Sequence, residues 1–361
     1  MASPERRPGL IVGVVGATGL VGRILLRVLE RRRFPVAQLR PFGSGRPGSA
    51  VSFRGRRLAC RAVSPASLLG CDIVFFVSSD EVSLRCARRL ADSGVWVIDD
   101  SSAFRLDPHV PLVIPEVNAR ALSPKSRLIA GPNCTLTGAA VALAPLRRAA
   151  GLSAVRIASY QAVSGAGRDA LEEFRAQMRR AGPLLAGGEV LDVPAFPRAR
   201  ALPAPIALNL FPQVGPFDRR GDSGEEFKVR EELRKIWSLP DLPISVTAVR
   251  VPVIRSHCLA VWIETQKPLG PARARAILRR APGLSLWARD EYPTPAAAQE
   301  TDPVHVGRLR RGAAKNELAL WIVSDNLLKG AALNSVQIAE ILLAKGWLAH
   351  RRAPPMRRPR G

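Results

Sequence analysis

Four glycines at a predicted strand-to-helix junction constrain the fold of this chain more than any other feature. The stretch VGVVGATGLVGRILLRVLE carries Gly13, Gly16, Gly19 and Gly22 between an apolar run and a helix-like pattern. Glycine permits a tight turn and close approach to a diphosphate, and the free N–H groups at the start of the helix favour an anion. Because the loop opens a strand–helix–strand pattern, it predicts a dinucleotide-binding fold rather than a glycine-rich turn of another α/β fold.

The remaining periodicity predicts two domains. Up to about residue 130, the runs LIVGVVG, CDIVFFVSS and VWVIDDSS alternate with helical stretches, which indicates an open parallel sheet with crossover helices. From about Leu152, the strand-like runs VRIASYQAVSG, ISVTAVRVPV, LAVWIETQKP and LALWIVSDN indicate an α+β domain with a mixed, largely antiparallel sheet. The Pro- and Gly-rich residues 184–217 read as an extended excursion, and the apolar residues 327–346 as a helix that packs onto a core.

These patterns give the expected domain limits. We expect a Rossmann-type dinucleotide-binding domain over residues 1–133 and a second, α+β domain over residues 134–325. A C-terminal helix over residues 326–346 returns to the first domain, and residues 347–361 form a basic, disordered tail.

The net charge of +24 is the one unusual feature of the composition, since such a value flags nucleic-acid binding. The basic residues are scattered along the whole chain, and only residues 351–361 concentrate them. Scattered charge of this kind fits a compositional bias better than a dedicated binding stripe. Nucleic acid is therefore disfavoured as the main partner.

Other compositional features bound the location and the metal content. No run of about 18 apolar residues suggests a membrane span, and the N-terminus has no separate apolar segment with a cleavage site. We therefore expect a cytoplasmic protein with no membrane partner. The five cysteines form no CxxC pair, which argues against a disulfide framework and against a structural zinc site. We expect reduced thiols and no metal.

The residues after the second predicted strand bear on the cofactor. No carboxylate occurs between Glu30 and Asp72, so the acidic residue that would bind the ribose of NAD is missing. Arg40, Ser44 and Arg46 instead suit a 2′-phosphate. The sequence therefore favours NADP over NAD.

Cys134 is the candidate nucleophile. It follows Gly-Pro-Asn and precedes an apparent helix, where the helix dipole and free N–H groups are expected to stabilise a thiolate. Position alone leaves the alternative of a buried small hydrophobe open. The other cysteines are expected to be buried spectators: Cys60, Cys71, Cys86 and Cys258.

A thiol nucleophile in an oxidoreductase needs a group that handles protons, and four histidines are available. His257 follows a predicted strand, with Arg250 seven residues before it, and on spacing alone it is as well explained by a structural role. His305 lies in a predicted strand and reads as structural, while His109 lies in a turn and His350 in the basic tail.

Further polar residues stand at ends of predicted elements. Gln161 ends a strand before a Ser-Gly-Ala-Gly turn and faces either a ligand or solvent. Glu225 and Lys228 are three apart on a predicted helix, for which a surface ion pair is the default interpretation. Arg105 lies just beyond the carboxyl end of a parallel strand, the side on which such sheets bind ligands.

Taken together, the motifs resemble those of one enzyme family. GATGLVG, DDSSAFR, GPNCT, YQAVSGAG, EEFK, RVPVIRSH, DEYPTP and SDNLLKGAALNSVQIAE occur in the order and approximate spacing of aspartate-semialdehyde dehydrogenases, over about residues 11–346. YQAVSGAG and RVPVIRSH resemble this family more than N-acetyl-glutamyl-phosphate reductase or glyceraldehyde-3-phosphate dehydrogenase. The resemblance implies that NADPH reduces 4-phospho-L-aspartate to L-aspartate 4-semialdehyde, with release of phosphate. This step leads toward lysine, methionine, threonine and isoleucine, and also toward diaminopimelate.

The resemblance also implies roles for individual residues. Cys134 would attack the acyl phosphate to form a thioester, His257 would be the acid/base, and Gln161 would orient the substrate. Arg250 would hold the substrate α-carboxylate, and Glu225 would face its amino group. The implied phosphate site consists of Arg105, Asn133 and Lys228. The positions expected to contact the cofactor are Gly16, Thr18, Gly19, Leu20, Val21, Ser44, Arg46, Ser164, Gly165 and Asn326.

The family implies a homodimer or homotetramer, so that the second domain would be both catalytic and a dimerisation domain. Two loops depart from the family pattern. Gly43 to Gly48 reads GSGRPG in place of Ser-Ala-Arg-Ser-Ala-Gly, which moves Arg46 by one position. In VSSDE, Asp80 adds a negative charge near the expected diphosphate. These departures leave a non-catalytic paralogue with a binding or structural role as the alternative.

Overall fold

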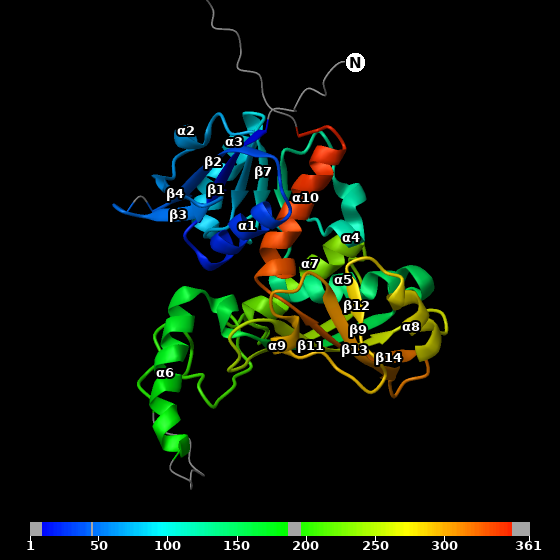
Figure 1. The fold of residues 1–361 in the computed structure, drawn as a ribbon. Helices are drawn as coiled ribbons and strands as arrows, with labels where there is room; N and C mark the ends of the chain where they lie inside the picture. The colour runs from blue at the N-terminus through cyan, green and yellow to red at the C-terminus, as the bar shows by residue number, and fades with distance from the viewer. Residues whose placement is uncertain (1–8, 45, 187–195, 349–361) are drawn as a thin grey trace, which may run out of the picture.

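A computed structural model describes residues 9–44, 46–186 and 196–348 of the chain. Within these residues the chain forms two six-stranded sheets, each with its own helices, and a two-stranded hairpin, and the last helix runs back along the first large sheet (Figure 1). The predicted α/β architecture, with a Rossmann-type domain and a second domain with a mixed sheet, is confirmed. No described helix is both long enough and apolar enough to cross a membrane.

The first domain contains a six-stranded sheet in the order β5-β2-β1-β6-β7-β8, in which every pair is parallel. Its central strands are buried on both faces, as expected for a parallel sheet covered by crossover helices. The strands are β1 (Leu10–Val15), β2 (Val36–Gly43), β5 (Arg61–Ala62), β6 (Ile73–Phe76), β7 (Trp96–Asp99) and β8 (Leu128–Ala130). The other elements are α1 (Leu20–Arg31), the hairpin β3 (Ala50–Phe53) and β4 (Arg56–Ala59), α2 (Pro65–Leu68), α3 (Asp80–Asp92), α4 (Pro115–Asn118) and the 3₁₀-helix η1 (Ala119–Ala121).

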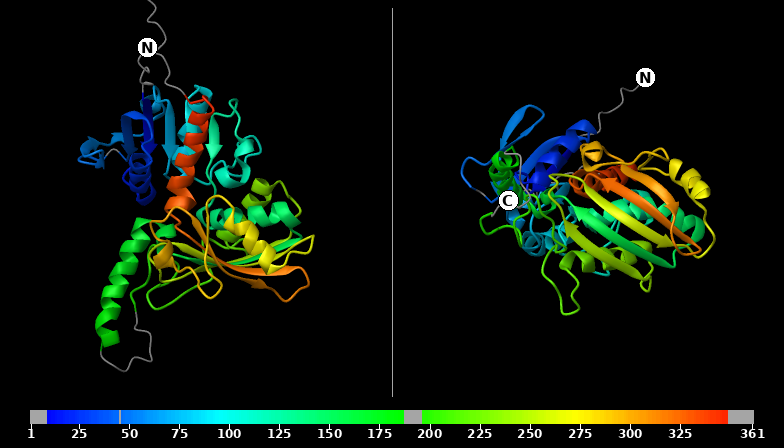
Figure 2. Two further views of the ribbon diagram at one scale, coloured as in Figure 1. Left: turned by 45° about the vertical axis from the view of Figure 1, so that its right-hand side comes forward. Right: turned by 90° about the horizontal axis from the view of Figure 1, so that it is seen from below.

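The second domain contains a six-stranded mixed sheet in the order β10-β9-β11-β14-β13-β12. The three inner pairs are antiparallel and the two outer pairs are parallel, so the largely antiparallel prediction is confirmed. The strands are β9 (Ala154–Gln161), β10 (Ile244–Arg250), β11 (His257–Glu264), β12 (Leu284–Leu286), β13 (Val304–Arg311) and β14 (Glu317–Ser324). The helices are α5 (Cys134–Ala150), η2 (Val163–Ala166), α6 (Arg168–Ala186), α7 (Gly224–Trp237), α8 (Pro271–Arg279) and α9 (Pro295–Ala298). Seen from below, one face of this sheet is largely open (Figure 2, right), and the short helix α9 packs on it through Ala298, which clusters with Cys258 and Val323.

The C-terminal helix joins the first domain, as predicted. A π-helical turn η3 (Leu328–Ala332) leads into α10 (Leu333–Ala344), which lies along the first sheet (Figure 2, left). The predicted disordered tail begins too early, because Leu348 is buried in the first-domain core and the carbonyl of Trp347 accepts a hydrogen bond from Trp96 Nε1. Two large apolar side chains gain free energy by leaving water. Residues 349–361, the rest of the predicted tail, lie outside the described residues.

The predicted excursion over residues 184–217 is only partly described. Helix α6 extends to Ala186, so the first three of these residues continue the helix. Residues 187–195 lie outside the described residues. Residues 196–217 contain no helix, and Phe211 makes an isolated bridge to Arg250.

The strand order reverses between β1 and β6, and in open α/β sheets such a switch point is where ligands bind. Here the glycine-rich loop packs tightly against the loop after β6. Gly16 has φ +86°, and a Cβ built on it would lie 2.4 Å from the carbonyl oxygen of Val77. A Cβ on Gly22 would lie 2.2 Å from the carbonyl oxygen of Gly16. These two positions therefore require glycine.

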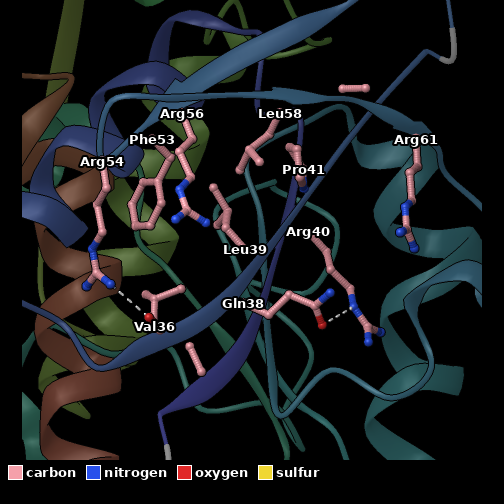
Figure 3. A pocket seen from close by; sticks show the side chains of 12 residues that line it. Val36, Gln38, Leu39, Arg40, Pro41, Phe53, Arg54, Arg56, Leu58 and Arg61 are labelled. Atoms are coloured by element: carbon pink, nitrogen blue, oxygen red, sulfur yellow. Dashed lines mark hydrogen bonds between the residues drawn. The ribbon is translucent and has the colours of Figure 1, made fainter.

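A groove lies along the part of β2 that does not pair with β5, away from this switch point. Four arginines line it over an apolar floor that includes Leu39, Phe53 and Leu58 (Figure 3). The guanidinium of Arg54 donates to the carbonyls of Val36 and Phe34, and that of Arg40 to Gln38 and to the carbonyl of Leu69. These arginines protect an exposed strand edge from pairing with another strand. Arg40, which the sequence suggested for the 2′-phosphate, lines this groove, and its contact with the cofactor stays a prediction.

We predict that Gly22→Ala destabilises the protein by about 1–3 kcal/mol, because the added methyl group overlaps the backbone of the glycine loop. Urea unfolding measures the change. Gly182→Ala is the matched control, since Gly182 is also helical but has open space around it. There alanine should leave stability unchanged or raise it by up to about 1 kcal/mol. If Gly22→Ala stabilised the protein as much as Gly182→Ala does, that result would contradict the tight packing of the loop.

Candidate active site

Most of the predicted catalytic, substrate and phosphate residues line one cavity of about 380 Å³ between the two domains, and His257 lies behind it in contact with Cys134. The lining from the first domain includes Val21, Val77, Ser78, Asp80, Asp100, Ser101, Ser102, Arg105 and Asn133. The lining from the second domain includes Cys134, Gln161, Ser164, Gly165, Glu225, Lys228 and Arg250, and Asn326 follows that domain. The predicted cofactor residues Ser44 and Arg46 do not line this cavity and lie exposed beyond the end of β2.

Cys134 is the first residue of α5, two residues before the predicted start of the helix. Asn133 caps the helix, because its side-chain Oδ1 accepts the N–H groups of Thr135 at 2.8 Å and Leu136 at 3.3 Å. Cys134 is half-buried. The neighbouring π-helical turn packs so closely that a Cβ on Gly330 would lie 2.9 Å from Cys134 Cβ. The thiol therefore lies at the N-terminus of α5, against the closely packed turn η3.

His257, at the start of β11, faces this thiol. Its Nε2 lies 3.5 Å from Cys134 Sγ, and its Nδ1 accepts the backbone N–H of Ala162 at 3.0 Å. The ring is fully buried, and burial together with the nearby Arg250 guanidinium lowers the pKa of His257 to about 3. His257 therefore contacts the predicted nucleophile, and its catalytic role stays a prediction. His305, by contrast, bonds to Thr301 and Trp287, away from the cavity.

The electrostatics of Cys134 differ from the expectation of a stabilised thiolate. Burial raises the pKa of the Cys134 thiol to about 11, and the Glu225 carboxylate raises it further. The guanidinium groups of Arg105 and Arg250 act in the opposite direction but do not overcome burial. Burial disfavours the thiolate because it removes the charge from water. With its pKa raised to about 11, Cys134 is a neutral thiol at neutral pH.

Glu225 does not form the surface ion pair with Lys228 that its spacing suggested. Its side chain is buried and accepts hydrogen bonds from Asn133 Nδ2 at 2.9 Å, Thr135 Oγ1 at 2.8 Å and Gln161 Nε2 at 3.2 Å. The face of α7 that carries Glu225 turns inward because it packs against α5. Glu225 therefore organises the nucleophile loop, while Lys228 lines the same cavity and is half-buried.

Glu232 was not singled out in the sequence and proves to be a central residue of the site. It is 1% exposed, and its Oε2 accepts the backbone N–H of Asn133 at 2.8 Å. Its Oε1 accepts Arg105 Nη1 at 3.2 Å. The sequence contained one indication of this role. Glu232 lies seven residues after Glu225 on the same predicted helix, so both carboxylates lie on one helical face.

Arg105 retains capacity to bind an anion. Its Nη2 donates to the carbonyl oxygen of Asp100 at 2.6 Å, in addition to the contact with Glu232. Its Nε is buried and has no hydrogen-bond partner among the described residues. A buried donor without a partner is costly, so this atom is a natural point of attachment for a ligand oxygen.

Gln161 and Arg250 reach the cavity from the carboxyl ends of two parallel strands. They lie opposite each other in the register of β9 and β10. Arg250 Nη1 donates to the carbonyl oxygen of Ala162 at 2.8 Å, and Gln161 Nε2 also donates to Ser159 Oγ at 3.1 Å. Parallel pairing therefore delivers an amide and a guanidinium to the same end of the sheet.

The predicted cofactor residues fall into two groups. Asn326 Nδ2 donates to Ser164 Oγ at 3.0 Å beside Gly165, so these three line the cavity together. The second group is the glycine loop, which leads into α1 and comprises Gly16 and Thr18 to Val21. Of these residues, only Val21 lines the cavity.

The added charge of Asp80 is accommodated within the chain. Its Oδ1 accepts the N–H of Ser102 at 2.8 Å, and its other oxygen contacts the Ser102 hydroxyl. Asp80 is also the first residue of α3, where the helix dipole favours a carboxylate.

We predict that Glu232→Ala lowers the free energy of unfolding by about 3–5 kcal/mol, because Arg105 would remain as a buried charge without its partner. Thermal or urea unfolding measures the loss. Glu81→Ala serves as the control, since Glu81 is exposed and meets only Arg85, at 4.0 Å. It should stay within about 0.5 kcal/mol of the wild type. A loss below about 1 kcal/mol in Glu232→Ala would contradict the role of the buried pair.

Comparison with known proteins identifies the family. The NAD binding domain model of semialdehyde dehydrogenases matches residues 11–124, and the dimerisation domain model of the same enzymes matches residues 143–329. An aspartate-semialdehyde dehydrogenase of Synechocystis sp. is 40% identical over 353 residues, which span 96% of this chain and 100% of that protein.

Solved structures agree. Aspartate semialdehyde dehydrogenase II of Vibrio cholerae superimposes with a TM-score of 0.86 at 35% identity, over 93% of this chain and 99% of that one. The same enzyme complexed with ASA gives a TM-score of 0.85, over 93% of this chain and 98% of that one. The chain therefore belongs to the aspartate-semialdehyde dehydrogenase family and is an enzyme of that family.

Proposed function

We propose that this enzyme uses NADPH to convert 4-phospho-L-aspartate into L-aspartate 4-semialdehyde and phosphate, through a thioester on Cys134. The observation that carries the proposal is the 3.5 Å contact between Cys134 Sγ and His257 Nε2, in which Cys134 lines the same cavity as Arg105 and Arg250. A thiol nucleophile beside an imidazole and two guanidinium groups suits an anionic acyl donor. The reaction would serve the synthesis of lysine, methionine, threonine and isoleucine.

The first domain fits a dinucleotide. The substitution-intolerant Gly16 and Gly22 keep the backbone close at the switch point, and α1 begins directly after the loop with Gly19 as its cap. Thr18 to Val21 would hold the diphosphate, Ser44 and Arg46 the 2′-phosphate, and Ser164, Gly165 and Asn326 the nicotinamide end. When bound, NADPH supplies the hydride that reduces the acyl carbon.

The substrate would be oriented by opposite charges at its two ends. Arg250 would bind the α-carboxylate through its guanidinium, and the buried carboxylate of Glu225 would face the α-amino group. Gln161 lies between them, because its amide contacts Glu225 and its strand neighbour is Arg250. It would orient the carbonyl that undergoes attack.

The phosphate would bind at the other side of the thiol. Arg105 offers a buried Nε without a described partner, and Lys228 lines the same cavity. Asn133, held by Glu225 and Glu232, would complete the site and place Cys134 beside the acyl carbon. Cations here would stabilise the negative charge on the leaving phosphate.

The chain would act as a homodimer or homotetramer in the cytoplasm. The largely open face of the second sheet supports assembly, since it exposes Tyr160, whose ring lies 5.6 Å from that of Trp321. Aromatic residues of this kind are enriched in protein interfaces.

We predict that Cys134→Ser lowers kcat for phosphate-dependent NADP reduction with aspartate semialdehyde by a factor on the order of 10⁴ or more. The hydroxyl is far less nucleophilic than the thiol, and a thioester cannot form. Reduced nicotinamide formation measures the rate, and arsenate can replace phosphate. Cys60→Ser is the control, because Cys60 lies at the end of the β3–β4 hairpin, outside the cavity. Inactive wild-type protein with both NADP and NAD would refute the proposed function.

We predict that Arg46→Ala raises the Kd for NADPH by about 10- to 100-fold, because it removes a charge-assisted bond to the 2′-phosphate. Titration calorimetry measures binding directly, and NADH, which lacks that phosphate, provides the internal control. Affinity for NADH should change by less than about 3-fold. Equal losses for both cofactors would show that Arg46 does not read the 2′-phosphate.

A further inference from the structure

The backbone of Ala162 separates two functional side chains. Its N–H donates to His257 Nδ1 at 3.0 Å, and its carbonyl oxygen accepts Arg250 Nη1 at 2.8 Å. Ala162 is fully buried between the end of β9 and η2, so water does not compete for either bond. A backbone N–H can only donate. His257 Nδ1 must therefore be an unprotonated acceptor.

This contact fixes the position of the imidazole proton. With Nδ1 bare, the neutral ring carries its single proton on Nε2, the atom that lies 3.5 Å from Cys134 Sγ. Turning the ring by half a rotation would place carbon atoms opposite both Ala162 and Cys134. Both hydrogen bonds would be lost, so the contacts determine the ring orientation as well as the tautomer.

A doubly protonated ring is disfavoured by the same surroundings. A proton on Nδ1 would point at the Ala162 N–H, and the Arg250 guanidinium lies nearby. A Cβ built on Gly165 would touch both groups, at 3.0 Å from Arg250 Nη1 and 3.2 Å from His257 Nε2. Among the described residues, no carboxylate bonds to His257. The carboxylate of Glu225 accepts its hydrogen bonds from Asn133, Thr135 and Gln161 instead. The lowered pKa of His257, caused by burial and by Arg250, agrees with this geometry.

We propose that His257 acts as a neutral hydrogen-bond donor through Nε2, first to Cys134 Sγ and then to the oxyanion on the acyl carbon. It does not act as the base that removes the thiol proton, because that role requires a bare Nε2 and a proton on Nδ1. This inference rests on the proposed function, and it replaces the acid/base role that the family resemblance implied for His257 with hydrogen-bond donation.

The proposed reaction balances without a histidine base. As the bond between Cys134 Sγ and the acyl carbon forms, the bond from that carbon to the phosphate oxygen breaks. The electron pair stays on the phosphate oxygen, which takes the thiol proton and leaves as hydrogen phosphate. After the acyl carbon is reduced, its oxyanion accepts the Nε2–H bond. Collapse to the aldehyde breaks the carbon–sulfur bond, and Sγ leaves as a thiolate that takes a proton from solvent.

Nitrogen NMR of the ¹⁵N-histidine-labelled protein tests the tautomer directly. The chain has four histidines, so His257→Gln assigns the signal by its disappearance. We expect an unprotonated Nδ1 and a protonated Nε2 throughout roughly pH 5 to 9. A doubly protonated ring or a proton on Nδ1 within this range would overturn the proposal. The measurement needs no activity, so it is independent of whether the proposed function holds.

Alkylation of Cys134 by iodoacetamide gives a second test. A neutral thiol beside a neutral imidazole should react faster with each rise in pH, along a single ionisation toward the raised pKa of Cys134. A thiolate–imidazolium pair would instead give a rate plateau around neutral pH, and that result would overturn the proposal. Cys134→Ser identifies the share of labelling that belongs to the other cysteines.

Activity of two variants separates donation from proton transfer. His257→Gln keeps a neutral N–H near the position of Nε2 but cannot exchange a proton, whereas His257→Leu removes the donor. We expect a loss of about 10²–10³-fold in kcat for His257→Leu, as for removal of an oxyanion donor. His257→Gln should retain activity within about 10-fold of the wild type. An equal loss in both variants, each shown to be folded by circular dichroism, would overturn the proposal.

Discussion

The rest of the site depends on two buried carboxylates that α7 holds against the nucleophile loop. Glu225 binds the side chain of Asn133 and Glu232 binds its backbone N–H, so the residue before Cys134 is fixed from both sides. Buried carboxylates are costly unless they are paired and hydrogen-bonded, and here both conditions hold. Their charges also offset those of Arg105, Arg250 and Lys228. The proposed substrate would bring a carboxylate and a phosphate to these three cations.

The topology explains why distant segments meet at this point. Gln161 and Arg250 end neighbouring parallel strands, and His257 begins the antiparallel strand on the other side of β9. An antiparallel strand starts where its neighbour ends, so all three side chains reach one end of the sheet. Helix α5 delivers Cys134 to the same end from the crossover between the domains. The chain therefore builds the site from one parallel and one antiparallel pairing, and the Ala162 peptide lies at their junction.

The parts of the site that could be predicted from sequence have local signatures. A few neighbouring residues are enough to identify the glycine loop, the Gly-Pro-Asn-Cys turn and the strand ends at Gln161 and Arg250. Three features could not be predicted. The inward turn of Glu225 depends on packing between α7 and α5. The raised pKa of Cys134 depends on burial that outweighs the nearby guanidinium groups. The donor from Ala162 is a backbone group that any residue except proline would supply. Such features arise from tertiary contacts, to which amino-acid identity gives no direct access.

On the side of the cavity where the cofactor is proposed to bind, contacts within the chain accommodate the charge of Asp80. Because Asp80 occupies the start of α3 and bonds to Ser102, that helix end is neutralised by the chain itself. A diphosphate would thus depend on the start of α1 for its N–H groups. That region is reinforced by two cations, since Arg23 Nε donates to the carbonyl of Thr18 at 3.1 Å and Arg168 reaches the same oxygen from the second domain. Arg168 begins α6, directly after the loop that carries Ser164 and Gly165. Arg168 therefore connects the phosphate end of the proposed cofactor site to its nicotinamide end. The same arginine links the glycine loop to the domain that carries the thiol.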